Sequence, residues 1–479
     1  MTVPRGALAD RLSLAELGAE LEVEAASLAN RYAARRAPYG RQAQPRRRRE
    51  VPPVPTTLAV HAGVHDHESP LVEVSIAPDQ INAAAPGTSG AASHGPTDAA
   101  AVLLHNTDAP GGPGGIVVAQ YDATSGVLRF VLPGRLVAGT TRHLDILPHA
   151  PGATTPPWPV EVTTKLDRAV VRVGGQPFTS YHVFGGRRPY LWPVIGPAGA
   201  SVVRGQGSAD HPHHTGLGLA YGGHSEDGSV NIWSDWDEPP YGPGGRMIHR
   251  GFRRVVSGPV YGEVAHDLTW VDTFGNPFAE EQRTVRFWWA SEGARFIDTT
   301  VEMAWIRDRG RGPLVIALRL PSEMDVPHHG AMTNDAGVPV PPAVGSSRVY
   351  RAAWVDGSGP SGDPPYPPPA GPPEVLVDQP GARPFREGPG DGPWQGIAIF
   401  DHPSNDDYPH EAGKYAGSMG PNGPGTGQIT LSLYPPAEAP HGPFTFTWRT
   451  YVHRGDAIDG KVAAQASSYQ RAPTATITA

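Results

Sequence analysis

Apolar residues occur along this chain in short runs separated by turn residues. Residues 71–76 read Leu-Val-Glu-Val-Ser-Ile, a partial alternation that suits a half-buried strand. Gly (59) and Pro (55) are abundant between such runs, as expected for many strand-connecting turns. Further runs rich in β-branched and aromatic residues occur at 127–132, 143–147, 169–173, 284–289 and 444–452. The pattern predicts a mostly β protein whose antiparallel sheets pack as sandwiches.

A helical pattern is clear only near the N-terminus. Residues 7–36 carry leucines at helical spacing, and Ser13 with Glu16 forms a capping-box pattern. The segment faintly resembles a repressor helix-turn-helix, and the four arginines at 46–49 could contact phosphates. We favour a surface helix with a solvated basic linker over DNA binding.

The length of 479 residues suggests two or three domains. The proline-rich stretch at 151–159 has the composition of an interdomain linker, and residues 357–393 have that of a long loop. We predict a helical segment with a basic linker over 1–50, a small β-sandwich domain over 55–153, a large β domain over 160–457 and a flexible tail over 458–479.

Composition removes several classes of function. The chain has no cysteine, which excludes disulfides, thiolate catalysis, zinc fingers and iron–sulfur clusters. A net charge of −8 gives no general attraction to nucleic acid or anionic lipid. The first residues lack the apolar core of a secretory signal, and no apolar run approaches the roughly 20 residues that span a bilayer. We expect a cytoplasmic protein without a membrane partner.

Side chains that could act in catalysis or bind a metal are most concentrated in the segment Asp210-His211-Pro212-His213-His214. In an extended backbone His211 and His213 point to the same side, so both could ligate one divalent metal or flank one substrate. Asp210 could fix a ring tautomer. The alternative is a polar loop with histidine caps. We favour a functional site because clustered imidazoles are costly to desolvate without partners.

Two further segments suit a carbohydrate site. Trp233, which follows Asn231 closely, could stack on the apolar face of a sugar ring, although a core tryptophan is equally compatible. Glu281 begins a strong strand and could act as a general base, although most glutamates at strand entries are merely solvated.

Three more histidines stand at predicted strand ends. An apolar run delivers Asp401-His402-Pro403-Ser404-Asn405 to a loop, which is a good way to present His402 to a cleft. His249 and His453 are placed similarly. Each alone is better explained as structural, but together with the cluster they make a many-histidine site plausible.

Together these motifs resemble a bacterial family often labelled PmoA-like (methane oxygenase PmoA), a domain of unknown function. The resemblance extends from about Arg188 to Gly455. Its motifs are Arg188-Pro189-Tyr190-Leu191-Trp192-Pro193, Gly196-Pro197, Val203-Arg204, Asp210 to Leu217, Asn231-Ile232-Trp233, Ile248-His249, Glu281-x-Arg283, Asn334-x-x-Gly337, Trp354-Val355-Asp356, Asp401-His402-Pro403-x-Asn405 and Val452-His453-x-Gly455.

The resemblance implies a fold similar to the galactose-mutarotase-like supersandwich, preceded here by the small β domain and the short helical segment. Such folds bind sugars on a concave sheet face and use histidine and carboxylate groups as acid and base. Members of the family look like parts of bacterial sugar catabolism. The resemblance therefore implies a small-molecule carbohydrate as the partner.

We accordingly expect a carbohydrate-active enzyme, of the hydrolase, lyase or epimerase type, that acts on a sugar or an oxidised glycoside. A non-catalytic sugar-binding or sensing module and a metal-dependent oxygenase are the alternatives. No cofactor is certain, but a divalent metal on His211 and His213 would fit. The expected catalytic residues are His211, His213, Glu281 and His402, and the expected substrate-binding residues are Arg204, Asn231, Trp233, His249, Asn405 and His453. Glu281 and the histidines at 249, 402 and 453 should converge with the cluster on one concave face.

Overall fold

The computed structural model describes residues 56–84, 99–108, 115–147, 159–205, 215–221, 230–234, 244–291, 293–307, 314–325, 329–335, 348–362, 392–416, 427–433 and 443–478. The predicted N-terminal helix and the histidine cluster at 210–214 lie outside these residues, as do residues 363–391 of the predicted long loop. That loop was expected to begin at residue 357, but 357–360 continue a strand. Among the described residues, no helix has the length and apolar character that crossing a membrane would require.

The first strands after residue 56 form a small antiparallel sheet, which the last strand of the chain joins. Its order is β26-β1-β8-β4-β5-β6-β3, and a two-stranded sheet and one helix accompany it. Its core consists of alternate residues of these strands, such as Leu58, Leu104 and Phe130, which are fully buried. The elements are β1 (Thr57–His61), β2 (His67–Glu68), β3 (Leu71–Ser75), α2 (Pro78–Ala84), β4 (Ala99–Asn106), β5 (Ile116–Asp122), β6 (Val127–Val131), β7 (Arg135–Leu136), β8 (Thr141–Ile146) and β26 (Thr474–Thr478).

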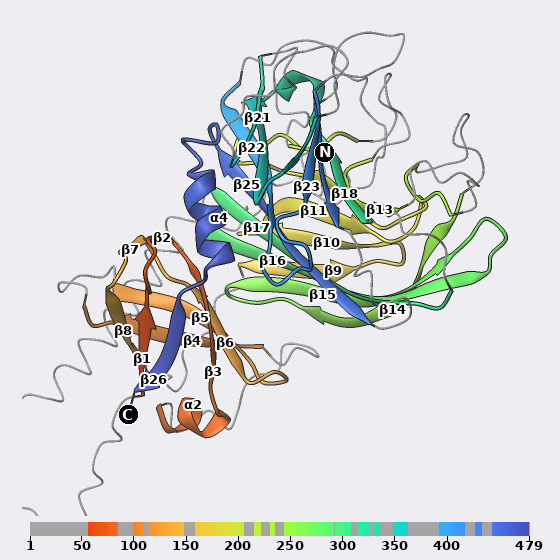
Figure 1. The fold of residues 1–479 in the computed structure, drawn as a ribbon. Helices are drawn as coiled ribbons and strands as arrows, with labels where there is room; N and C mark the ends of the chain where they lie inside the picture. The colour runs from red at the N-terminus through yellow and green to blue at the C-terminus, as the bar shows by residue number, and fades with distance from the viewer. Residues whose placement is uncertain are drawn as a thin grey trace, which may run out of the picture.

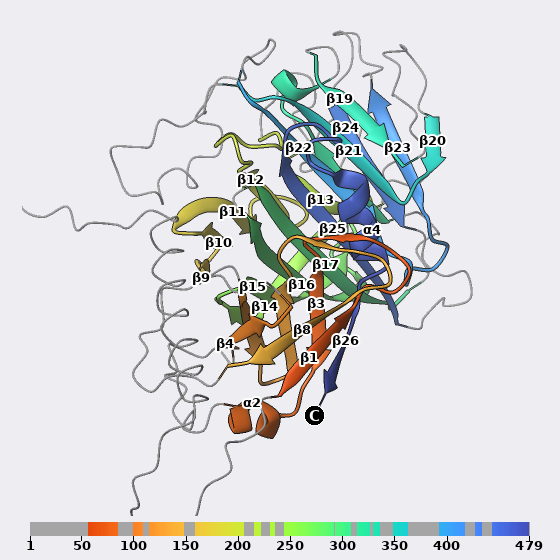
Figure 2. The same ribbon diagram turned by 90° about the vertical axis from the view of Figure 1, so that its left-hand side faces the viewer.

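The last strand corrects the prediction of a flexible tail over 458–479. Residues 462–470 form helix α4 (Val462–Gln470), and β26 pairs along its whole length with β1 at the other end of the chain. Ala475 and Ile477 pack against the core of the small sheet, and Figure 2 shows β26 beside β1. The alternation of Thr474-Ala475-Thr476-Ile477-Thr478 was the signal of a half-buried strand. We propose that the small β domain is discontinuous and takes its last strand from the C-terminus.

A chain that ends at Pro473 is expected to lose about 1–2 kcal/mol of stability in the small domain, because the partial burial of Ala475 and Ile477 is lost. Hydrogen exchange should quicken in β1, which becomes an edge strand, while the large sandwich keeps its protection. Replacing the exposed Thr476 with alanine is the matched control. Unchanged exchange in β1 would contradict a structural role for β26.

The large domain is a sandwich of two antiparallel sheets. The nine-stranded sheet has the order β20-β23-β24-β18-β13-β12-β11-β10-β9, and the eight-stranded sheet has the order β14-β15-β16-β17-β25-β22-β21-β19. Their strands are β9 (Val160–Thr164), β10 (Arg168–Val173), β11 (Gln176–His182), β12 (Tyr190–Val194), β13 (Leu217–Tyr221), β14 (Arg246–Val256), β15 (Tyr261–Val271), β16 (Pro277–Ser291), β17 (Ala294–Trp305), β18 (Leu314–Arg319), β19 (Ala331–Asn334), β20 (Arg348–Arg351), β21 (Trp354–Pro360), β22 (Trp394–Asp401), β23 (Glu411–Ala416), β24 (Gly427–Leu433) and β25 (Phe444–Arg454), with a 3-10 turn at Ser322–Met324.

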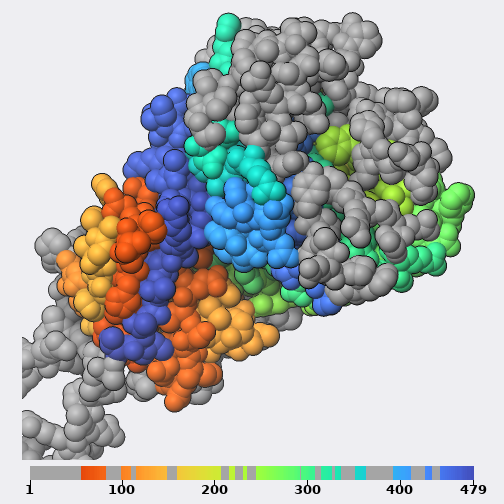
Figure 3. Space-filling model, in the orientation of Figure 1, coloured from red at the N-terminus to blue at the C-terminus, as the bar shows by residue number. Residues whose placement is uncertain are grey.

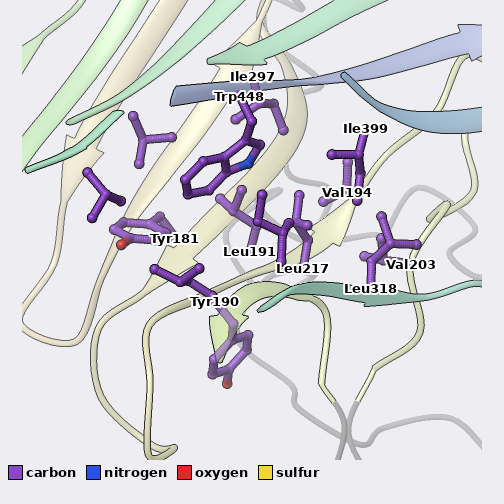
Figure 4. Close-up of a cluster of buried hydrophobic side chains, with 14 of the residues drawn as sticks. Tyr181, Tyr190, Leu191, Val194, Val203, Leu217, Ile297, Leu318, Ile399 and Trp448 are labelled. Atoms are coloured by element: carbon purple, nitrogen blue, oxygen red, sulfur yellow. The ribbon is translucent and has the colours of Figure 1, made fainter. Parts of the chain in front are cut away.

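One large apolar core lies between these two sheets. Alternate residues of each strand enter it, so Leu191 and Leu318 of the nine-stranded sheet pack with Ile297 and Trp448 of the eight-stranded sheet (Figure 4). The predicted mostly β fold, a large antiparallel sandwich preceded by a small β domain, is therefore confirmed. The predicted strands at 71–76, 127–132, 143–147, 169–173, 284–289 and 444–452 all coincide with or overlap observed strands.

The small domain and α4 cover part of the outer face of the eight-stranded sheet. Figure 1 shows α4 between the small domain and the large sandwich, and Figure 3 shows the C-terminal segment running along the small domain. Tyr261 and Phe400 of this face belong to one apolar cluster with Val462 of α4. Asp122 of the small domain pairs with Arg254 at 2.9 Å. The small domain and α4 thus occupy the part of this face around Tyr261 and Phe400.

Candidate functional site

A pocket lies on the outer face of the nine-stranded sheet. In β18, Ile316 and Leu318 belong to the core between the sheets, so Ala317 and Arg319 point the other way. The pocket is lined by Arg188, Gly216, Trp233, Ala317, Leu318, Arg319 and Gln428. These residues come from four strands or strand ends and one connecting segment, which the sheet brings together.

The floor of this pocket consists of small residues. Gly218 of β13 lies opposite Ala317 of β18 in the antiparallel register. A Cβ atom at Gly218 would lie 3.2 Å from Nε of Arg188 and 3.1 Å from the carbonyl oxygen of Pro189. A larger residue would therefore displace the guanidinium that lies across β13. The small residue at 218 thus makes room for the Arg188 side chain, which packs directly over the sheet.

The pocket walls are polar and held in place. Nη1 of Arg188 donates hydrogen bonds to the backbone oxygens of Ile232 (3.2 Å) and Trp233. Oδ1 of Asn231 accepts the backbone N–H of Trp233 at 2.9 Å, so both contacts fix the segment that carries the indole. Nη2 of Arg319 donates to Oε1 of Gln428 at 3.0 Å. Walls of this kind are organised before a ligand arrives.

Gly216 connects this pocket to the histidine cluster. Its φ angle is +61°, and a Cβ atom there would lie 2.2 Å from the carbonyl oxygen of Leu191, so only glycine fits. Its N–H donates to the carbonyl oxygen of Arg204 at 2.9 Å. His213 is three residues earlier, and three residues span at most about 11 Å. The position of His213 itself lies outside the described residues.

The structure places Glu281 in the core rather than in this pocket. Its side chain is fully buried, and Arg283 donates to both carboxylate oxygens, from Nε at 2.5 Å and from Nη2 at 3.0 Å. Nε1–H of Trp270 donates to it at 2.7 Å. The expected role as a general base does not fit this position, because the carboxylate is sealed between the two sheets and its oxygens already accept bonds.

A hydrogen-bonded chain extends from this ion pair to His249. Nη1 of Arg283 donates to the Tyr181 oxygen at 3.2 Å, and that hydroxyl lies 2.9 Å from Nε2 of His266. Nδ1 of His266 lies 2.8 Å from Nδ1 of His249. An arginine only donates, so the chain is satisfied if Tyr181 donates to a neutral His266, which then donates to a neutral His249.

Burial keeps both of these imidazoles neutral. Desolvation lowers the pKa of His266 well below 6.5, and the neighbouring charges of Arg283 and His249 lower it further. Burial also lowers the pKa of His249, against the opposing effect of Asp267. Burial raises the pKa of Tyr181 to about 12. We therefore interpret His249 as the outer end of a buried polar chain rather than as a substrate anchor.

The Asp401-His402-Pro403-Ser404-Asn405 segment forms a turn. Asn405 donates to Oδ1 of Asp401 at 2.8 Å and to the carbonyl oxygen of Thr447 at 2.7 Å, which anchors the turn to β25. Nδ1 of His402 bonds to the hydroxyl of Ser404 (2.7 Å), and its ring packs on Tyr469 of α4. His402 therefore serves the contact with α4, and Asn405 holds the turn against β25.

His453 is also structural in its contacts. Its Nε2 lies 2.8 Å from Oδ1 of Asp356, and both side chains are fully buried. Cβ atoms at Gly396 or Gly460 would lie about 2.3–2.4 Å from its ring, so these glycines make room for it. Four strand-to-strand steps separate β25 from β14, and the register puts Phe444, nine residues before His453, in the row of His249, so the two histidines lie far apart in the sheet.

The expected convergence on one concave face is therefore wrong for the described residues. Glu281 and His249 lie inside the sandwich, His402 lies against α4, and His453 is buried beside Asp356. Among the expected residues that the structure describes, Trp233 alone lines the pocket, supported by Asn231 and adjoined by the backbone of Arg204. His211 and His213 stay predictions.

Several residues of these sites were not recognised in the sequence. Arg188 stands in a motif that was quoted, yet no role was given to it, and Arg319 and Gln428 carry no local signal. His410 was also missed: its Nδ1 bonds to Oδ2 of Asp401 at 2.9 Å and its Nε2 is buried. Alternation in β18 and β24 could have shown that Arg319 and Gln428 share one face of the sheet.

Metal binding is not visible in the described part of the chain. There, no group of three or more His, Asp or Glu side chains is arranged to hold a metal ion. The expected ligands His211 and His213 lie outside it.

Solved structures resemble the chain only distantly. An alpha-mannosidase from Enterococcus faecalis V583 has 11% sequence identity and a TM-score of 0.41, over 88% of this chain and 46% of its own. A glycosyl hydrolase family 38 protein from Enterococcus faecalis has 10% identity and a TM-score of 0.40, over 89% and 47%. A heparan sulfate lyase HepC mutant from Pedobacter heparinus has 10% identity and a TM-score of 0.30, over 63% and 38%.

This chain spans less than half the length of each of these proteins. Because all three TM-scores are below 0.5, none of these likenesses bears on what the chain does. No curated protein matches it. One family model matches residues 168–467, which is most of the large domain, and nothing in the match carries the PmoA-like name. The chain therefore belongs to the family of unknown function DUF6807.

Proposed function

We propose that this protein is a carbohydrate-active enzyme of sugar catabolism that binds its substrate on the outer face of the nine-stranded sheet. One observation carries the proposal. A small hollow lined by a tryptophan and two arginines reaches Gly216, two residues after the cluster of three histidines. On the opposite outer face, the small domain and α4 cover the part around Tyr261 and Phe400.

Each wall of the pocket has a use in binding a sugar. The indole of Trp233 can stack on the apolar face of a pyranose. Arg188 and Arg319 can donate hydrogen bonds to oxygens at the ring edge. Ala317 adds a small apolar surface between these polar groups.

The reaction itself is assigned to the histidine cluster. Imidazoles titrate near neutral pH, so His211 and His213 can supply a base and an acid for proton transfer beside a carbonyl or at an anomeric hydroxyl. If the same pair holds a divalent metal, the metal supplies Lewis acidity toward a carbonyl. Glu281 is removed from the catalytic set because of its burial.

The test is a thermal-shift and calorimetric screen of sugars, glycosides and 3-keto-sugars. We expect a stabilising ligand whose Kd rises about tenfold or more in Trp233→Ala, equivalent to about 1.4 kcal/mol. Trp394→Ala is the matched control, because Trp394 is an exposed tryptophan at the start of β22, in the eight-stranded sheet. No shift across a broad panel, or equal losses in both variants, would reject this pocket as the sugar site.

Two other outcomes of the same screen lead to different functions. If His213→Ala keeps sugar binding and loses turnover, the protein is an enzyme; if the wild type binds sugars and turns over none, it is a sugar-binding or sensing module. Metal analysis separates the oxygenase alternative, which requires bound iron or copper and oxygen consumption.

A further inference from the structure

We infer that Tyr181 and His266 are positioning residues that hold His249 in the tautomer whose Nε2 carries the proton. This imidazole then meets solvent as a hydrogen-bond donor. The inference is independent of the proposed sugar pocket, because none of these three side chains lines it. It gives the outer end of the buried polar chain a chemical character, that of a group which binds an acceptor oxygen and not a metal ion.

A break in the strand pairing brings the two histidines together. His249 of β14 and His266 of β15 belong to the eight-stranded sheet, and Tyr181 of β11 reaches them from the nine-stranded sheet. One extra residue, Arg250, interrupts the register of β14 with β15. The rings of His249 and Phe252 therefore both lie against His266, with centroids 5.0 Å and 6.0 Å from its own. The bulge thus aims His249 at the buried imidazole.

Arg283 sets the direction of the hydrogen bonds along the chain. A guanidinium only donates, so the Tyr181 oxygen accepts from Nη1 of Arg283 at 3.2 Å. The hydroxyl can then donate its own proton to Nε2 of His266, which lies 2.9 Å away. A neutral His266 that accepts at Nε2 carries its proton on Nδ1 and donates it to Nδ1 of His249 at 2.8 Å. The proton of a neutral His249 is therefore on Nε2.

The opposite direction leaves a buried donor without an acceptor. If His249 donated from Nδ1, His266 would have to donate from Nε2 to the Tyr181 oxygen. The tyrosine hydroxyl would then face two donors, and its own proton would have no acceptor among the described residues. A buried donor left unpaired in this way should make the reversed chain rarer by about tenfold or more.

A charged form does not replace either arrangement near neutral pH. Desolvation lowers the pKa of His266 well below 6.5, and the charges of Arg283, His249 and Arg253 lower it further. Burial also lowers the pKa of His249, while the charge of Asp267 opposes that shift. Both imidazoles are therefore neutral, and each has one tautomer that satisfies the chain.

The outer nitrogen of His249 lies among aromatic rings at the surface. His249 is partly exposed, and its Nε2 is not one of the buried atoms that lack a partner. Phe252 packs on the imidazole at 4.6 Å, and Phe184, which is 50% exposed, lies edge-on to it at 5.9 Å. A protonated Nε2 has no lone pair to give to a metal ion, but it can donate to a hydroxyl, carbonyl or carboxylate oxygen.

Nuclear magnetic resonance of the histidine rings tests the inference directly. The full-length protein should be labelled with ¹⁵N-histidine and its ring nitrogens observed at neutral pH, with His249→Gln used to assign the signals of His249. We expect a lone pair on Nδ1 and a proton on Nε2, with this tautomer in excess by about tenfold or more. A proton on Nδ1, or an even mixture of the two tautomers, would overturn the inference.

Tyr181→Phe tests whether the chain sets the tautomer. The variant removes the hydroxyl that donates to His266, so the second tautomer of His249 should become populated and its two ring-nitrogen signals should move toward each other. Tyr121→Phe is the matched control, because the Tyr121 hydroxyl is buried without a partner in the small domain. An unchanged tautomer ratio in Tyr181→Phe would contradict the positioning role. If that variant does not fold, the tautomer of the wild type decides alone.

Discussion

Replacing Arg283 with methionine should destabilise the protein by about 3–5 kcal/mol, the usual cost of removing one partner of a buried ion pair. The reason is local. The carboxylate of Glu281 is fully buried, and Arg283 supplies two of the hydrogen bonds that it accepts. Without the guanidinium a charge remains in the core, and the Tyr181 hydroxyl loses a donor. Urea unfolding at neutral pH measures the loss.

The double variant Glu281→Leu with Arg283→Met is the matched control. It removes both charges and keeps apolar volume, so it should recover most of the stability lost in the single variant. Glu281→Gln should also destabilise, since it leaves the Arg283 cation without its anion. A loss of less than 1 kcal/mol in Arg283→Met would contradict this structural role. A purely catalytic defect in Glu281→Gln with unchanged stability would do the same, and Glu281 would again be a candidate general base.

Acidification from pH 6.5 to pH 4 should cost about 3 kcal/mol of stability through His182 alone. Burial lowers the pKa of His182 to about 4, and the charge of Arg168 lowers it too, while its bond to the carbonyl oxygen of Trp192 and the charge of Asp167 oppose the shift. The unfolded chain therefore binds a proton at higher pH than the folded chain does. Stability is complete above pH 6.5, falls as the pH approaches 4, and then levels off for this group.

His266 and His249 act in the same direction, because their pKa values are also lowered by burial. Urea unfolding between pH 7 and pH 4 gives the slope. His182→Gln is the control, because a glutamine amide can still donate to Trp192 but does not titrate. The slope of unfolding free energy against pH should therefore be smaller in this variant, by an amount equivalent to at most one bound proton. Identical slopes in the wild type and in this variant would show that His182 is charged in the folded protein.

The strands were predictable because their residues alternate locally. Val72 and Val74 enter the core while Glu73 and Ser75 face out, and this pattern is readable without tertiary information. The discontinuity of the small domain was not predictable from the sequence, because the pairing of β26 with β1 joins residues more than 400 positions apart. Five residues with two modest apolar side chains resemble a frayed tail until their partner is known.

The candidate site was only partly predictable for a similar reason. Trp233 was recognised by its type, but the arginines that line the same pocket come from distant strands. Glu281 was misjudged because a strand-entry glutamate looks solvated in sequence, whereas Arg283 two positions later faces the same side and pairs with it inside the core. The spacing of two residues between Glu281 and Arg283 was visible in the sequence. The side of the sheet that these residues face was not.

Hydrogen exchange with and without a bound sugar tests the central claim most directly. A carbohydrate found by the screen should slow exchange in β12, β13, β18, β24 and the segment around Trp233, all on the nine-stranded sheet, and leave β14, β15 and β21 unchanged. Protection confined to the eight-stranded sheet or to the small domain would contradict the claim that the outer face of the nine-stranded sheet is the site.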